Sequence, residues 1–307
     1  MKKIDIFEVG PRDGCQNIAK LIPTEMKKRI IDGLTESGMA HIQICSFVSP
    51  KAIPQMRDAQ EVAEYCVSRY PDSDLLALVP NLKGAKSAYE AGIRHISYVV
   101  SLSESHNKAN TNRTRKESLR ELADIMDTYP DLKICVDIAT AFGCPFEGRP
   151  QDGELTEFTE QVHKMGIKEV CLCDTIGAAD PWQVRNEIRK ISGLELKLMV
   201  HIHDTRGMGL ACTLAAVEEG VGSIQPTLGG LGGCPFAPGA SGNTATEDLV
   251  YMFHRMGYDT GIDFDKLLEL SKYQKSVIQG SYSGHHVMIQ DQKKRAEKGG
   301  GQTCTAR

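Results

Sequence analysis

ESGMAHIQI at residues 36–44 indicates the fold, because the same arrangement returns three more times along the chain. The other copies are EAGIRHISY (90–98), KMGIKEVCL (164–172) and EEGVGSIQP (218–226). The four copies each contain a glycine at the same place: Gly38, Gly92, Gly166 and Gly220. Glycine is favoured just after a helix, because a left-handed backbone conformation costs it nothing. The repeat predicts helices that end at a glycine and lead into a strand, in units of about 27 residues.

Eight segments of the chain are rich in β-forming residues. They are IDIFEV (4–9), HIQICS (41–46), DLLALV (74–79), HISYVV (95–100), KICVDI (133–138), EVCLCD (169–174), KLMVHIHD (197–204) and SIQPTL (223–228). Helical patterns separate most of them, as in PTEMKKRIIDGLTESG (23–38). This alternation predicts an α/β protein with a (β/α)₈ TIM barrel. A doubly wound open sheet usually carries an early GxGxxG turn, which the start of this sequence lacks.

The composition is that of a globular protein, with 307 residues, 41% of them hydrophobic, and a net charge of −4. The negative charge argues against nucleic-acid binding, which usually needs a basic face. No apolar run approaches the roughly 18 residues of a membrane helix, and MKKIDIFEVG does not resemble a signal peptide. We therefore expect a cytoplasmic protein that binds neither nucleic acid nor a membrane.

The same patterns predict one barrel domain over residues 1–275 and a helical C-terminal extension over 276–307. The end of this extension, KKRAEKGGGQTCTAR (293–307), is charged and glycine-rich, so we expect it to be mobile. The ten cysteines are scattered without a paired CxxC framework, which predicts mostly buried thiols. Cys304 lies in the expected mobile end.

Candidate chemistry stands where two of the predicted strands end, which is where TIM barrels carry their active sites. Arg12 and Asp13 follow the first strand. His201 and His203 are two residues apart on the seventh, so they point to the same side, although a buried hydrogen-bonded pair is the alternative. Asp13 and Asn243 can add two oxygen donors to the two imidazoles. This donor set predicts Mg²⁺ or Mn²⁺ and no organic cofactor.

Seven motifs together carry a family resemblance. They are GPRDGCQN (10–17), SFVSPKAIPQM (46–56), PNLKG (80–84), FGCPFEG (142–148), CDTIG (173–177), HIHDTRG (201–207) and GGLGGCPFAPGASGNTATEDLVYM (229–252). They resemble the 3-hydroxy-3-methylglutaryl-CoA lyases, metal-dependent TIM-barrel enzymes related to isopropylmalate and homocitrate synthases. The resemblance runs from about residue 4 to 275. The last motif is the most specific, because the synthases carry a different loop there.

The resemblance implies cleavage of 3-hydroxy-3-methylglutaryl-CoA to acetyl-CoA and acetoacetate, by an enzyme expected to be a homodimer. It implies that Asp13, His201, His203 and Asn243 bind the cation. Arg12 would stabilise the enolate oxygen, His201 would also transfer a proton, and Cys234 would act as acid or base on a mobile loop. The residues expected around the acyl-CoA are Gln16, Gln43, Ser46, Phe47, Asp137, Asp174, Thr175 and Gln225. The candidates for contact with its phosphates are Lys51, Lys83, Lys108, Asn110 and Arg113, with a solvated surface position as the alternative for each.

The chain departs from the family pattern at several expected site positions. Gln43 and Gln225 stand where the family usually has acidic residues, and Asp137 and Ala139 where it has an aromatic residue and a serine. Because of these changes, a different lyase substrate remains an alternative, such as a citramalyl-type thioester that yields pyruvate. A condensing synthase and a barrel without catalysis are weaker alternatives, because the loop around Cys234 and the candidate ligands are intact.

Overall fold

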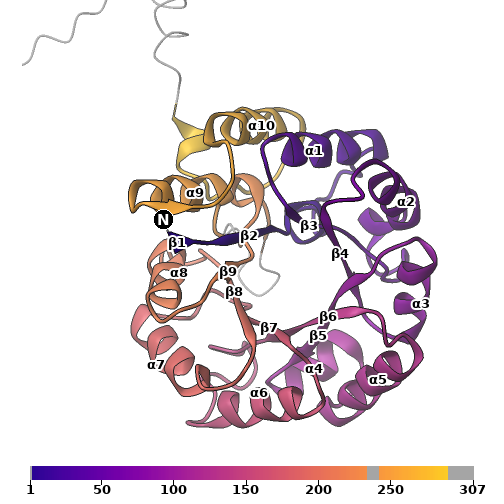
Figure 1. Ribbon diagram of the computed structural model, residues 1–307, viewed down its shortest axis with the longest axis vertical. Coiled ribbons are helices and arrows are strands. Elements are labelled where there is room, and N and C mark those ends of the chain that lie inside the picture. Colours follow the sequence, from indigo (N-terminus) through magenta and orange to yellow (C-terminus); the bar gives the residue numbers. More distant parts are fainter. Residues whose placement is uncertain (1, 234–241, 290–307) are drawn as a thin grey trace, which may run out of the picture.

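The computed structural model, which describes residues 2–233 and 242–289, is a closed barrel of eight parallel strands (Figure 1). The barrel strands are β2 (Asp5–Glu8), β3 (His41–Ser46), β4 (Asp74–Val79), β5 (His95–Ser101), β6 (Lys133–Ala139), β7 (Glu169–Asp174), β8 (Lys197–Ile202) and β9 (Ser223–Ile224). Each strand pairs with the next, and β9 pairs with β2 to close the ring. The predicted TIM barrel is confirmed.

An outer ring of helices surrounds the barrel (Figure 1). The helices are α1 (Thr24–Glu36), α2 (Ala59–Arg69), α3 (Leu82–Glu90), α4 (Glu104–Thr111), α5 (Arg115–Thr128), α6 (Glu154–Lys164), α7 (Pro181–Ile191), α8 (Gly209–Glu218), α9 (Thr246–Arg255) and α10 (Phe264–Val277). A two-stranded ribbon of β1 (Lys2–Lys3) and β10 (Tyr258–Asp259) lies outside the barrel. No helix within the described ranges is long and apolar enough to cross a membrane.

The four repeated glycines end their helices as the sequence predicts. Gly38, Gly92, Gly166 and Gly220 have φ angles of 91°, 89°, 101° and 98°, all in the left-handed region. Each follows a helix by one or two residues and precedes the next barrel strand. The repeat in the sequence is therefore a repeat of one backbone turn, which returns the chain to the barrel wall.

The last barrel strand is shorter than the predicted segment 223–228. Pro226 has no backbone N–H, so it cannot continue a ladder of hydrogen bonds. Its carbonyl nevertheless accepts a bond from the N–H of Val9 at 3.0 Å, and the N–H of Gln225 donates to the Val200 carbonyl at 2.9 Å. The chain thus keeps its place in the wall after β9 and then turns at Leu228–Gly230.

The amino-terminal end of the barrel is closed by a charged network, named here the basal network. Nδ1 of His95 lies 2.7 Å from Oδ1 of Asp74, and its Nε2 lies 3.1 Å from Oε2 of Glu169. Lys133 approaches the same Glu169 carboxylate at 2.9 Å. An apolar layer containing Phe7, Leu76, Cys135, Cys171, Cys173 and Met199 packs in one cluster. The opposite, carboxyl end is therefore the end available for a site.

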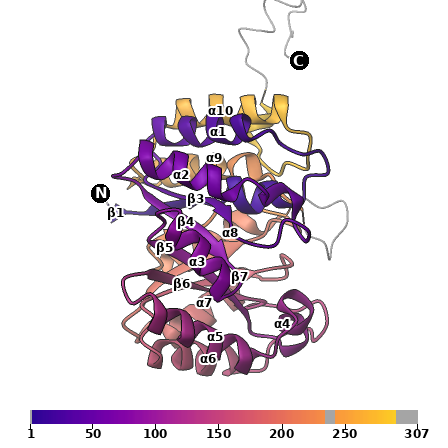
Figure 2. The ribbon, with the colours of Figure 1, turned by 90° about the vertical axis from the view of Figure 1, so that its right-hand side faces the viewer.

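The C-terminal extension packs against the segment that leads to this open end. α10 lies beside α1 in both views, and the expected boundary at residue 275 falls within α10 (Figures 1 and 2). Beyond α10, Ser283 donates its hydroxyl to the Asn243 carbonyl at 2.6 Å, and the Gly284 N–H donates to the Gly229 carbonyl at 3.0 Å. Cys304 and the expected mobile end lie outside the described residues. The described cysteines are all free and buried, as expected.

Candidate metal centre and substrate cavity

Strand β8 and the segment after residue 241 bring the candidate ligands together. His201 lies on β8, and His203 follows the strand by one residue. His203 forms an antiparallel bridge with Asn243, and the Asp204 N–H donates to the Gly242 carbonyl at 2.8 Å. These backbone bonds place the Asn243 amide beside the two imidazoles, although it is forty residues further along the chain.

A short π-helical turn at Gly10–Gly14 carries Arg12 and Asp13 at the end of β2. The buried carboxylate of Glu8 anchors this turn, because its Oε1 accepts the N–H groups of Gly10 at 2.7 Å and Leu228 at 2.8 Å. Burial raises the pKa of Glu8 to about 7. A Cβ atom on Gly10 would clash with this Oε1, so a larger residue there would displace the anchoring carboxylate.

The ligand atoms of Asp13, His201 and His203 all lie within 4.8 Å of one another. Nε2 of His201 is 3.1 Å from Nε2 of His203 and 3.9 Å from Oδ2 of Asp13. Nδ1 of His201 lies 2.7 Å from the Gln225 carbonyl and donates to it, so Nε2 keeps its lone pair. The tautomer of His201 therefore suits a metal ligand.

The Asn243 amide has an unused oxygen at this point. Its Nδ2 donates to Oδ2 of Asp13 at 2.9 Å and to the Leu231 carbonyl at 3.1 Å. Its Oδ1 is buried and has no hydrogen-bond partner. A buried polar atom left unpaired destabilises a protein by about 1–3 kcal/mol. A cation between the imidazoles and Asp13 would give this oxygen a partner, so the donor set fits a divalent metal.

The protonation states of two of the candidate ligands also suit a cation. Burial raises the pKa of Asp13, but the positive charge of Arg12 outweighs it and holds the pKa well below its usual value. Burial lowers the pKa of His203 to about 3, and the neighbouring His201 contributes in the same direction. The site therefore presents an ionised carboxylate and a neutral imidazole, which are the forms that bind metal ions.

Arg12 is fixed from two sides. Its Nη1 forms an ion pair with Oδ1 of Asp13, and its Nε donates to Oε1 of Gln43. Gln43 in turn donates from Nε2 to the Ser97 hydroxyl at 2.8 Å. The absence of an acidic residue at position 43 therefore does not leave the guanidinium free, because the amide oxygen binds it instead.

A cavity of about 520 Å³ opens above these groups. Of the residues expected around the acyl-CoA, Gln16, Ser46, Asp137, Thr175 and Gln225 line it, and so do the candidate phosphate contacts Asn110 and Arg113. Gln43 stands behind Arg12 instead. Phe47 packs against the core, and Asp174 accepts the backbone N–H groups of Ala178 and Ala179. Lys51, Lys83 and Lys108 are not among the lining residues.

Sequence reasoning missed several polar residues in and behind this cavity, among them His106 and Ser97. His106 lines it, with Nδ1 2.7 Å from the Ser101 hydroxyl, and Ser97 stands behind it against Gln43. The signal for His106 was its place just after the fourth predicted strand, which is β5 in the structure. Ser97 could be found only from the alternation of inward positions on that strand. Cys234, the proposed acid or base, lies outside the described residues.

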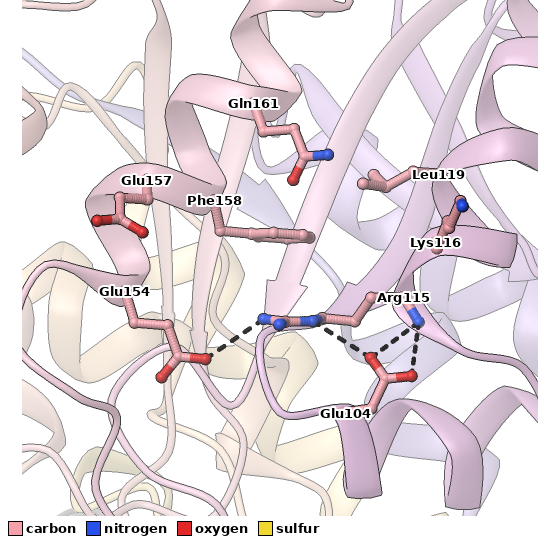
Figure 3. Close-up of a pocket in the computed structure, with 8 residues that line it drawn as sticks. All are labelled: Glu104, Arg115, Lys116, Leu119, Glu154, Glu157, Phe158 and Gln161. Carbon is pink, nitrogen blue, oxygen red and sulfur yellow. Dashed lines mark hydrogen bonds and ion pairs between the residues drawn. The ribbon is translucent and has the colours of Figure 1, made fainter.

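A second hollow, of about 490 Å³, lies on the outer wall between α5 and α6 (Figure 3). Arg115 crosses it below the Phe158 ring and reaches Glu104 and Glu154, each at 3.3 Å. The guanidinium is thus neutralised by carboxylates from both sides. The ion pairs in this hollow connect α4, α5 and α6, and its lining residues include none of the candidate catalytic residues.

Comparison with known proteins gives a consistent result. The HMGL-like family model matches residues 3–273. The mitochondrial hydroxymethylglutaryl-CoA lyase of Mus musculus is 40% identical over 276 residues, which are 89% of this chain and 85% of that protein. The hydroxymethylglutaryl-CoA lyase YngG of Bacillus subtilis is also 40% identical, over 89% of this chain and 92% of its own.

A solved structure agrees with these relatives. The HMG-CoA lyase of Acinetobacter baumannii, in complex with coenzyme A and 3-methylmalate, superposes with a TM-score of 0.87 at 38% identity. The match covers 99% of this chain and 97% of that one. The similarity therefore extends through the barrel and into the C-terminal extension.

Proposed function

This chain belongs to the HMGL-like family, and we propose that it cleaves 3-hydroxy-3-methylglutaryl-CoA to acetyl-CoA and acetoacetate at the carboxyl end of its barrel. The observation that carries the proposal is the ligand group Asp13, His201 and His203 with the unpaired Asn243 oxygen beside it. This group lies at the floor of a cavity that Arg12 also lines. The reaction is a retro-Claisen cleavage, which needs both a cation and a cationic side chain.

Asp13, His201, His203 and Asn243 would hold the cation, which would lower the pKa of the tertiary hydroxyl group of the substrate. Mg²⁺ or Mn²⁺ fits the two nitrogen and two oxygen donors. Nε2 is the only nitrogen of His201 with a free lone pair, because Nδ1 is bound to the Gln225 carbonyl. His201 can therefore bind the cation or carry a proton at Nε2, but it cannot do both at once.

Arg12 would stabilise the negative charge that forms on the thioester carbonyl oxygen as the carbon–carbon bond breaks. Its guanidinium is held by Gln43 and Asp13 before the substrate enters, so little reorganisation is needed when the charge develops. Gln16, Ser46 and Thr175 line the same cavity and would contact the acyl group. Cys234 would supply or remove a proton at carbon, on the grounds of the family resemblance.

The test is an assay of the metal-loaded protein on two thioesters, the methylglutaryl and the citramalyl substrate. We expect faster cleavage of the first, with acetoacetate released beside acetyl-CoA. Faster release of pyruvate from the second would replace the proposed substrate. The names of the relatives favour the methylglutaryl substrate over this alternative and over a condensing synthase.

The remaining proposals rest on the family resemblance for the oligomeric state and the role of Cys234, and on the sequence pattern for the location. We propose a homodimer, which light scattering on the purified chain tests directly. A cytoplasmic location is proposed as well, and fractionation of the native cells tests it. A loss of activity in Cys234→Ser with unchanged metal content would support the assigned role of that thiol.

A further inference from the structure

Four buried polar side chains from four barrel segments form a continuous chain of contacts. Arg12, Gln43, Ser97 and Asp137 are 8%, 1%, 0% and 3% exposed. Arg12 donates from Nε to Oε1 of Gln43, and Gln43 donates from Nε2 to the Ser97 hydroxyl at 2.8 Å. The Ser97 hydroxyl also bonds to the carboxyl group of Asp137, whose pKa is raised by burial. The cavity above them is the proposed substrate cavity, which both Arg12 and Asp137 line.

In this series of hydrogen bonds, the two terminal groups, Arg12 and Asp137, set which atom donates at each step. A guanidinium can only donate, so it selects the oxygen of the Gln43 amide. The amide nitrogen is then the atom that faces Ser97 and donates to it. A hydroxyl that accepts on one side keeps its proton for the other, and the Asp137 carboxyl group offers an acceptor oxygen on that side. Arg12 and Asp137 therefore fix the orientation of Gln43 between them.

We propose that Gln43, Ser97 and Asp137 are positioning residues that act as a directional relay to aim Arg12, with Asp137 as the terminal acceptor. The catalytic consequence rests on the proposed function. Where the family usually places a carboxylate at position 43, this chain places a neutral amide and has its acidic residue at position 137. Among the described residues, only Asp13 forms an ion pair with Arg12. The relay thus orients the guanidinium while leaving more of its charge for the substrate oxygen.

The relay makes positions 43 and 137 dependent on each other. Gln43→Glu would place a second carboxylate against the Ser97 hydroxyl, which has one proton for two acceptors. The two carboxylates would repel in a buried space, and Arg12 would be drawn into a second ion pair. Asp137→Asn removes this repulsion and still offers Ser97 an acceptor oxygen. The double variant should therefore recover the kcat and the stability that Gln43→Glu loses.

The test is a double-mutant cycle measured on metal-loaded protein. We expect Gln43→Glu to lower kcat about tenfold with a smaller change in KM, and Asp137→Asn to lower it less than about threefold. The double variant should return to within about threefold of the parent. Additive losses in the double variant would overturn the relay, and so would a Gln43→Glu protein as active as the parent.

Thermal unfolding of the same proteins without metal or substrate repeats the test independently of the reaction. Gln43→Glu should lower Tm, and the double variant should restore it. Ser97→Ala removes the middle of the relay and should lower kcat. Ser37→Ala is the control and should leave kcat unchanged, because it removes a buried hydroxyl that donates to the Leu34 carbonyl at 2.7 Å, outside the relay. If the parent protein does not cleave the substrate but the Tm changes of the two substitutions are non-additive, only the proposed function is rejected. Additive Tm changes in the double variant would reject the relay.

Discussion

At the scale of single residues, the candidate metal centre consists of polar atoms that either have hydrogen-bond partners far away in the sequence or have none. Oδ1 of Asn243 is buried without a partner, while every donor on its amide nitrogen is used. A protein tolerates such an atom where a ligand satisfies it. Nε2 of His201 is a candidate ligand on other grounds, because the bond of Nδ1 to the Gln225 carbonyl leaves Nε2 as an acceptor.

His203→Ala tests the ligand set. We expect the affinity for Mn²⁺ to fall at least about tenfold, because one nitrogen donor is lost from the group. Isothermal titration of metal-free protein measures it without any assay of activity. His163→Ala on α6 is the matched control and should bind Mn²⁺ as the parent does. Equal Mn²⁺ affinity in His203→Ala would contradict the assignment.

Glu8→Gln should remove a pH dependence of stability. Burial raises the pKa of Glu8 from 4.5 to about 7 in the folded state. The folded protein therefore holds this proton more tightly, and its stabilising effect is present below pH 4.5 and is lost as pH rises towards 7. The total change is roughly 3 kcal/mol, at about 1.4 kcal/mol per pKa unit.

Glutamine reproduces the protonated form, because its Oε1 can accept from Gly10 and Leu228 while its amide donates to Thr246. We therefore expect the variant to be at least as stable as the parent at pH 8, with a flatter profile between pH 4.5 and 7. Urea unfolding across this range measures both proteins. Parallel profiles would show that Glu8 does not titrate in this window.

At the scale of elements, the repeated unit is a helix that ends in a left-handed glycine and returns to the barrel. Gly220 shows the physical requirement most clearly. It has a φ angle of 98°, yet an added Cβ atom would meet nothing within 4 Å. The need for glycine is therefore one of backbone conformation and not of space.

Gly220→Ala should lower the free energy of unfolding by about 1–2 kcal/mol, the energy of a left-handed conformation for a residue with a Cβ atom. Gly222 lies two residues further, is equally open, and does not have a positive φ. Gly222→Ala is therefore the control and should change stability by less than about 0.5 kcal/mol. Equal losses in the two variants would mean that the repeat has another cause.

At the scale of the whole molecule, the two ends of the barrel have separate tasks. The basal network of Asp74, His95, Lys133 and Glu169 closes one end, and the candidate site occupies the other. Glu169→Gln leaves His95 and Lys133 with one carboxylate fewer, so we expect a loss of about 1–3 kcal/mol in unfolding free energy. The value of kcat for the folded protein should not change. A fall in kcat at constant stability would show that the two ends are coupled.

The sequence predicts some parts of this molecule well because they depend on short-range geometry. The glycine repeat specifies the helix ends and strand starts, and the two-residue spacing of His201 and His203 places both imidazoles on one side of β8. It overestimates β9, because a propensity pattern does not register that Pro226 cannot donate to the ladder. It also places Gln43 at the substrate, whereas the structure places it behind Arg12.

By itself, the sequence determined the barrel, the end of the barrel that carries the candidate site, and the donor types of the candidate metal centre. Only the tertiary structure decided how Asn243 meets His203, and how Ser97 and Asp137 reach Arg12 through Gln43. Helix ends and strand faces follow from backbone angles within a few residues. Contacts between side chains of different strands depend on the closure and register of the whole barrel, which no single segment contains.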